Sequence, residues 1–396
     1  MAFVFLIIPF FANSRAFCAG CLMSGFWLLL LKYPLKRNQI LIIGCGVITV
    51  SLIILVCFIK PDSSLGRVLI YKISFNIFKD HWLEGLGWQK FNLNYLYYQA
   101  AYFKAGNFAP KELLLADNTQ FAFNDYWQFI LETGIKGIIF LMLLFVIISH
   151  LLIKISKKLS SHPVLPLLAA SAIITISTAA VTMHVFERFY IQCIFITCFL
   201  IVTGYVYPAQ AKKTLGIWII IMLGLSYYTW GFYVKHYISY QKMYAAENLW
   251  QAGYLRESVT NYRALYEELK NDPEYLVKYA EVLSTLNETI EAEEILKQAI
   301  AKQVTNLHYD HLAGLYYKNG KIKEAEQAYL TAVYMVPNRF KTRYDLFLFY
   351  NKTHQYAKAV KTGRDILQLP VKVPSVTISN IRKYIADTLS EFRKAI

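Results

Sequence analysis

The chain has 396 residues, of which 56% are hydrophobic and 17% are charged, and its mean hydropathy is +0.34. An average soluble domain is about 45–50% apolar and about 25% charged, so this composition excludes a wholly soluble protein. The net charge of +15 lies mostly in and between the apolar blocks. Residues 60–132 carry seven basic and seven acidic side chains, so the excess is a topology signal and not a nucleic-acid-binding surface.

Residues 1–235 contain seven apolar stretches, which predict a polytopic bundle of transmembrane helices. About 20 apolar residues are needed to cross a bilayer, and most of the stretches approach that length. Met1 begins inside the first stretch, so we expect either that the chain is a fragment or that its start is misassigned. The stretches cover residues 1–12, 16–31, 40–59, 135–153, 164–183, 189–207 and 215–232.

Three short basic loops set the predicted orientation of this bundle. Loops rich in lysine and arginine stay in the cytoplasm, which places the long loop 60–134, the turn 184–188 and the C-terminal domain on the outer side. The cations that decide this orientation are Lys32, Lys36, Arg37, Lys154, Lys157, Lys158, Lys212 and Lys213.

Residues 240–396 change to the amphipathic period of soluble helices and contain an internal repeat. Small residues recur at intervals of 34, 33 and 34 as Ser258, Ala292, Ala325 and Ala359. This pattern resembles the tetratricopeptide repeat, which predicts an all-α chain with an α-solenoid after the membrane bundle. The solenoid is expected to offer a groove to a peptide or protein partner or to be purely structural. The clearest repeat is the run Tyr309, Leu312, Ala313, Tyr316, Gly320, Ala325, Tyr329, Ala332 and Pro337.

The outward loop 60–134 and its flanks carry the residues on which the functional prediction depends. In chain order the motifs are Ser14-Arg15-Ala16, Asp62 with Gly66-Arg67, His81 to Trp88 followed by Phe91, Asn124-Asp125-Tyr126-Trp127-Gln128, and Glu132-Thr133-Gly134 leading to Gly137. Their order resembles the O-antigen ligase and O-antigen polymerase superfamily of bacterial inner-membrane glycan-transfer proteins, over residues 10–150. A downstream tetratricopeptide domain is a known companion of this family.

The resemblance implies a multi-pass glycosyltransferase of the bacterial inner membrane that uses no metal, cofactor or nucleotide sugar. It implies transfer from an undecaprenyl-diphosphate carrier to a lipid A core, a glycan or a protein on the periplasmic side. A diphosphate leaving group needs fixed cations, and we expect Arg15 and Arg67 to supply them at the outer membrane boundary. A snorkelling role stays open for Arg15, as does pairing with Asp62 for Arg67. Asn124 and Trp127 are expected around the acceptor.

Phe123 departs from the family pattern. The ligases commonly carry a histidine immediately before the motif asparagine, where it is proposed to assist the acceptor, whereas a phenylalanine transfers no proton. Glu132 is the first candidate for a substitute base. A structural role is equally plausible for it, because a carboxylate near a helix N-terminus is stabilised by the helix dipole. Otherwise this branch works without a base, or the chain is not catalytic. Further candidates for the base are Asp125, Asp117 and His81.

The sequence contains none of the common motifs of other enzyme classes. It contains no Gly-rich phosphate loop, no nucleophile elbow and no Cys/His cluster with metal-ligand spacing, so we predict no metal site. The alternative function is a non-catalytic membrane scaffold whose outward tetratricopeptide domain recruits an envelope partner.

Overall fold

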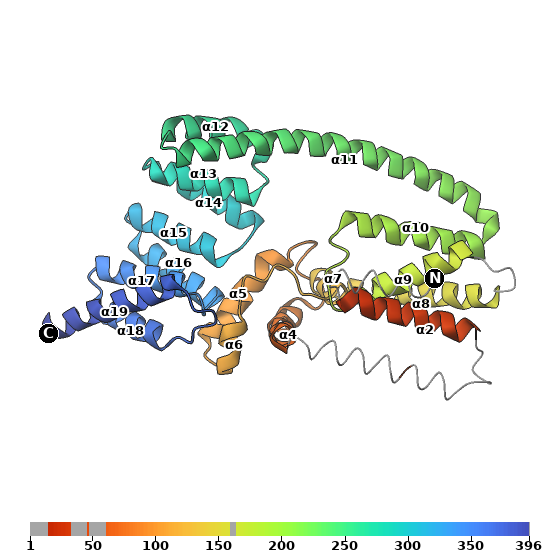
Figure 1. Ribbon diagram of the computed structural model, residues 1–396, viewed down its shortest axis with the longest axis horizontal. Coiled ribbons are helices and arrows are strands. Elements are labelled where there is room, and N and C mark those ends of the chain that lie inside the picture. The colour runs from red at the N-terminus through yellow and green to blue at the C-terminus, as the bar shows by residue number, and fades with distance from the viewer. Residues whose placement is uncertain (1–14, 33–45, 47–60, 159–163, 396) are drawn as a thin grey trace. The chain divides into compact units, whose positions relative to one another are not determined.

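The computed structural model describes residues 15–32, 46, 61–158 and 164–395, and every regular element in these ranges is a helix (Figure 1). This confirms the predicted all-α class. The helices form two compact units, which are described separately below. The first unit takes the chain up to residue 71, residues 77–91 and residues 121–229. The second unit takes residues 72–76, 92–120 and 230–396.

A close pairing of α2 (Arg15–Lys32) with α9 (Val164–Ala179) lies at the centre of the first unit. Gly20 permits this pairing, because a Cβ atom at Gly20 would lie 2.5 Å from the main-chain oxygen of Thr175. The Thr175 hydroxyl donates to the Gly20 carbonyl at 3.3 Å. Two further helices, α8 (Ile135–Lys157) and α10 (Phe189–Val206), pack on α9 around the buried side chain of Ile173.

Two of these helices are long and apolar enough to cross a membrane. The mean hydropathy is 2.8 for α8 and 2.0 for α10, and only 11% of each apolar window is buried within the described protein. Most of their apolar surface is therefore available to lipid. Shorter apolar helices cover Ala16–Leu31 and Val164–Ala179, and the predicted span 215–232 lies inside α11 (Pro208–Gln251).

The predicted total of seven spans is not confirmed by these helices. Predicted span 1–12 lies outside the described residues, as does span 40–59 apart from residue 46. The described part of the chain contains two clear span candidates.

The second unit contains consecutive helices of 13 to 15 residues that pack against one another in sequence order (Figure 1). A longer helix, α19 (Val376–Ala395), follows them. The shorter helices are α12 (Leu255–Leu269), α13 (Pro273–Thr285), α14 (Thr289–Lys302), α15 (Asn306–Lys318), α16 (Ile322–Met335), α17 (Phe340–Lys352) and α18 (Tyr356–Gln368).

The small residues of the repeat occupy the same position in α12, α14, α16 and α18. Ser258, Ala292, Ala325 and Ala359 are each the fourth residue of their helix, and all four are 0% exposed. The main-chain N–H of each donates to the carbonyl of the residue that precedes the helix. A larger side chain at any of these positions would enter a packed helix interface. The tetratricopeptide pattern is therefore confirmed at the level of packing.

A left-handed residue stands in the turn before each of these four helices. Gly253, Asn287, Gly320 and His354 have φ angles of 89°, 63°, 75° and 59°. Glycine and asparagine adopt this conformation more easily than other residues, so three of the four turns carry a suitable residue. The repeat thus fixes backbone conformation as well as side-chain size.

Residues 92–120 of the loop 60–134 belong to the second unit. They fold mainly as α5 (Phe91–Lys104) and α6 (Pro110–Leu115). Glu112 joins these two helices, because its carboxylate accepts the Tyr102 hydroxyl at 2.6 Å and the Ala109 N–H at 2.9 Å. The remaining helices of the loop are α4 (Pro61–His81), which both units share, and α7 (Asp125–Thr133) of the first unit.

Candidate active site

Helix α7 forms the closing motif of the loop, and Asn124 starts it. The Asn124 side-chain oxygen accepts the Trp127 N–H at 3.0 Å, which satisfies one of the free donors at the helix N-terminus. The half-buried Trp127 ring lies 5.5 Å from the Phe78 ring of α4. Both residues predicted to surround an acceptor therefore have a defined place at the start of α7.

Glu132 connects the end of α7 to the turn at residues 87–91. Its buried carboxylate accepts the main-chain N–H of Gln89 at 3.0 Å and of Phe91 at 3.4 Å. The Gln128 amide also donates to it at 3.3 Å. Burial raises the pKa of the Glu132 carboxyl, while these hydrogen bonds act in the opposite direction. The carboxylate thus links two parts of the loop.

Two glycines bring the backbones of these same segments into contact. Gly85 has φ +76°, and a Cβ atom there would lie 2.3 Å from the Glu132 carbonyl oxygen. Gly134 has φ +64°, and its Cβ atom would lie 2.6 Å from the Leu83 carbonyl oxygen. The Gly87 N–H donates to the Glu132 carbonyl at 2.9 Å. Only glycine combines this conformation with such an approach, which explains the glycines of both motifs.

Asp125 holds a different segment, the turn that connects α9 to α10. Its carboxylate accepts the N–H groups of Val185 at 2.7 Å and Phe186 at 3.1 Å. Its own N–H donates to the Ala180 carbonyl at 2.9 Å. Burial raises the pKa of the Asp125 carboxyl to about 6, although the two hydrogen bonds favour the charged form.

Phe123 lies at the centre of the site with an unfavourable backbone conformation. Its φ of 52° is uncommon for a bulky residue, and such strain is often found at functional sites. The Arg67 guanidinium carbon lies 5.8 Å from the centre of the Phe123 ring, and the Tyr71 hydroxyl donates to the Phe123 carbonyl at 3.4 Å. The His184 ring packs edge-on against Phe123 at 5.5 Å.

Arg15 is the first residue of α2, and the main chain places it near this cluster. The adjacent Ala16 is buried in a cluster with Val185 and Ala180, against which Tyr126 also packs. The start of α2 therefore belongs to the same end of the first unit as Asp125 and its turn.

The other predicted residues lie elsewhere. His81 is the exposed last residue of α4, and its carbonyl accepts the Gly85 N–H at 2.8 Å. Asp117 belongs to the second unit, where it pairs with Arg339 at 2.8 Å. Within the described ranges, no group of three or more metal-ligating side chains is placed to hold an ion.

An apolar groove in the first unit begins beside this cluster. It has a volume of about 650 Å³ and is lined by residues of α7, α8, α9 and α10, from Tyr126 and Phe186 to Leu152. Its lining is mostly apolar, so the groove suits an apolar chain better than a polar group.

Within the second unit, residues 92–120 are held by polar side chains of the solenoid. The Asn338 amide donates to the carbonyl groups of Leu113, Leu114 and Ala116 at 3.0, 3.1 and 2.8 Å. Asn306, which is 1% exposed, exchanges hydrogen bonds with Asn118 at 2.8 and 3.1 Å. The solenoid therefore binds a segment of its own chain.

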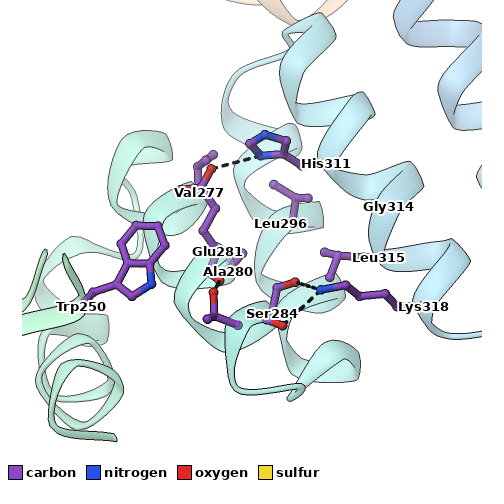
Figure 2. A pocket seen from close by; sticks show the side chains of 11 residues that line it. Trp250, Val277, Ala280, Glu281, Ser284, Leu296, His311, Gly314, Leu315 and Lys318 are labelled. Atoms are coloured by element: carbon purple, nitrogen blue, oxygen red, sulfur yellow. Dashed lines mark hydrogen bonds and ion pairs between the residues drawn. The ribbon is translucent and has the colours of Figure 1, made fainter. Parts of the chain in front are cut away.

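A separate pocket of the solenoid is lined by residues of α11, α13, α14 and α15 (Figure 2). It has a volume of about 410 Å³, and Trp250 lies at one side of it. Glu281 pairs with His311 at 3.2 Å, and Lys318 donates to the Ser284 hydroxyl at 2.9 Å. The pocket thus combines an aromatic wall with charged groups of both signs.

Residues 1–142 match the family model described as O-antigen ligase (Wzy_C). This match confirms the resemblance predicted from the sequence and supports a glycan ligase or polymerase type of function. No curated protein matches the chain.

Solved structures match a part of the chain. A structure titled "Crystal structure of MamA protein" is 16% identical with a TM-score of 0.32, and the match covers 39% of this chain and 88% of that one. "MamA 41-end from Desulfovibrio magneticus RS-1" is 15% identical with a TM-score of 0.32, over 40% of this chain and 96% of that one.

His184 was not among the residues predicted for the site. The sequence placed it only in the outward turn 184–188, which precedes α10 by a few residues. Only the predicted membrane topology could have pointed to His184, because it puts this turn on the same side of the membrane as the loop 60–134.

Proposed function

We propose that the chain is an inner-membrane glycan transferase that moves a glycan from an undecaprenyl-diphosphate carrier to an acceptor on the periplasmic side. The acceptor is a lipid A core, a growing glycan or a protein. In this reaction the acceptor hydroxyl loses its proton, and its oxygen forms a bond to the anomeric carbon of the donor sugar. The bond from that carbon to the diphosphate breaks, and the lipid diphosphate leaves with the electron pair.

The observation that carries this proposal is the convergence of the family motifs at Phe123. Arg67 from the opening motif and Asn124 from the closing motif flank this residue, and the start of α2 with Arg15 lies in the same unit. Arginine stays charged at every relevant pH and binds phosphate oxygens with two parallel donors. We assign Arg67 and Arg15 to the diphosphate, and the apolar groove beside Tyr126 to part of the polyprenyl chain.

Glu132 and Asp125 are assigned to positioning in this scheme. Both oxygen atoms of Glu132 accept main-chain N–H groups, and Oδ2 of Asp125 accepts two of them, so each carboxylate is held by the backbone of a neighbouring turn. Asn124 and Trp127 stand at the N-terminus of α7, where they are assigned to the acceptor. His81 remains a weaker candidate because it lies at the exposed end of α4.

The test uses the full chain reconstituted in proteoliposomes with an undecaprenyl-diphosphate-linked oligosaccharide. Lipid A core and a second donor molecule are offered as acceptors, and release of undecaprenyl diphosphate is measured. We expect Arg67→Ala and Arg15→Ala to lower the rate by about 100-fold or more, as for removal of a transition-state donor. Arg256→Ala on the solenoid is the matched control. Equal rates for all variants would refute the assignment.

The second candidate function is a membrane scaffold that recruits an envelope partner, and the open pocket of the solenoid favours it (Figure 2). Under this function, Arg67→Ala would leave surface glycan unchanged. Trp250→Ala and His311→Ala would abolish co-purification of an envelope protein with the full chain. The two functions therefore predict opposite responses to variants of the two units.

A further inference from the structure

We propose that His184 is the proton acceptor of the reaction. It lies next to Phe123 in the fold and would replace the histidine that the ligases commonly carry at that position. This inference rests on the proposed glycan transfer. It names a catalytic residue from a part of the chain beyond the segment that matches the family, since that segment ends at residue 142.

The first argument is the position of the imidazole. His184 stacks on Phe121, with ring centres 4.3 Å apart and an interplanar angle of 5°. It meets the Phe123 ring edge-on at 5.5 Å. The imidazole therefore lies against the very side chain that replaces the family histidine. An acceptor bound beside Phe123 would therefore have an imidazole next to it, which Phe123 itself does not provide.

The second argument is an unsatisfied ring nitrogen. Nδ1 of His184 is shielded from solvent, and within the described part of the chain it has no hydrogen-bond partner. A buried polar atom without a partner costs about 1–3 kcal/mol, and native structures retain few of them. Because water does not reach Nδ1 in this conformation, the imidazole has to turn to bring this nitrogen to the hydroxyl group of a bound acceptor, which then supplies the missing partner.

The third argument is the way in which the turn is held. Asp125 accepts the N–H groups of Val185 and Phe186, the two residues that follow His184. The Gln192 amide donates to the Phe186 carbonyl at 2.6 Å, which ties the turn to α10. A motif residue of the matched segment thus fixes the backbone next to His184. Asp125 is a positioning residue in this arrangement.

The charges around the imidazole suit a neutral base. Burial lowers the pKa of His184, and the positive charges of Arg188 and Arg67 act in the same direction. The carboxylate of Glu187 acts against them. A histidine with a lowered pKa is neutral at pH 7 and is ready to take a proton.

The proposed step balances as follows. The acceptor hydroxyl gives its proton to His184 while its oxygen bonds to the anomeric carbon of the donor sugar. The undecaprenyl diphosphate leaves with the electron pair, and the arginines stabilise its charge. The imidazolium then releases the proton to water, which restores the neutral base.

The main test compares His184→Asn with His354→Asn in the proteoliposome assay. Asparagine keeps a polar side chain but accepts no proton near neutral pH, so we expect His184→Asn to lower kcat by about 10²- to 10⁴-fold. His354 stands at a left-handed turn of the solenoid, which asparagine adopts readily, so this variant should keep the wild-type rate. Unchanged transfer by His184→Asn would overturn the proposal.

A rescue variant separates catalysis from folding. Phe123→His restores the family residue at a position with φ 52°, where histidine is better tolerated than phenylalanine. We expect the double variant Phe123→His with His184→Asn to regain at least about tenfold of the lost rate. The rate of the wild type should fall with acid as a single imidazole becomes protonated, and this limb should be absent in His184→Asn. The double variant could be as slow as His184→Asn, and the rate of His184→Asn could still fall with acid as in the wild type. Together these results would show that His184 has a structural role only.

The outcomes also separate this inference from the proposed function. If the wild type releases no undecaprenyl diphosphate with either acceptor or with an added envelope protein fraction, the glycan transfer itself is refuted. If the wild type transfers glycan and His184→Asn does so equally well, only the assignment of the base fails.

Discussion

The two parts of the loop 60–134 are held by different kinds of contact. Its arms, residues 77–91 and 121–134, belong to the first unit and are joined by main-chain hydrogen bonds and two closely packed glycines. Its middle, residues 92–120, belongs to the second unit and is held by amide side chains and an exposed ion pair.

This difference indicates different tasks. Contacts between backbones leave little freedom, so the two arms are held in one geometry, as the proposed transfer requires. Side-chain amides of the solenoid bind the middle as a tetratricopeptide domain would bind a foreign peptide. The solenoid therefore acts on its own chain, whether or not it also binds a partner through its open pocket (Figure 2).

The largest effect is expected from Gly85→Ala, with Gly106→Ala as its matched control. Both glycines have nearly equal φ angles, +76° and +77°, so each substitution costs about 1–2 kcal/mol of backbone strain. A Cβ atom on Gly106 meets nothing within 4 Å, whereas one on Gly85 overlaps Glu132 and adds about 1–3 kcal/mol. Thermal unfolding and transfer rate of the full chain measure the difference. Equal losses would mean that the arms are not joined through this contact.

The next effect concerns the middle of the loop. Asn338→Ala leaves three carbonyl groups without their donor, so we expect the bound segment to lose about 1–3 kcal/mol. Hydrogen exchange of residues 92–120 should then become about 5- to 100-fold faster, with no change in the arms. Asn351→Ala, at the C-terminal end of α17, is the control. Faster exchange in the arms as well would show that the middle of the loop and its arms are not held by separate contacts.

A smaller, pH-dependent effect is expected from Asp125→Asn. The folded pKa of about 6 lies above the ordinary value of 3.8, so this carboxyl stabilises the fold most below about pH 4. That contribution is lost as the pH rises through about 6. The Tm of the variant should therefore rise relative to the Tm of the wild type as the pH increases from 4 to 7. A constant difference across this range would contradict the assignment.

The smallest effect is expected from Arg339→Ala. Its ion pair with Asp117 is exposed, with 52% and 56% of the two side chains accessible, so it contributes about 0–1 kcal/mol. Hydrogen exchange in residues 92–120 should change slightly at low salt, and not at all near 1 M salt. A large effect that persists in high salt would show that the pair does more than surface electrostatics allows.

The sequence predicted the features that depend on periodicity. The spacing of Ser258, Ala292, Ala325 and Ala359 predicted a packed repeat because each repeat needs a small residue at the same interface. The left-handed turn at His354 was not predicted, since a single histidine does not by itself mark that conformation.

The candidate site was predictable only where its residues lie in one motif. Asn124, Asp125 and Glu132 are close in sequence and therefore share a short helix. His184 joins them through ring contacts with Phe121 and Phe123, and its neighbours Val185 and Phe186 donate to Asp125 across about 60 residues, a contact that no local pattern marks. The binding of residues 92–120 by the solenoid depends on single asparagines, which have no sequence signature of their own.

The distance in sequence between the middle of the loop and its binding site has a consequence for biosynthesis. Gln99 donates to the carbonyl of Met335, which is 236 residues later in the chain. At a synthesis rate of about 5–20 residues per second, the ribosome needs about 10–50 s to make that partner. During this interval the segment has left the ribosome before its binding site exists, so chaperones and proteases can meet it before the solenoid does.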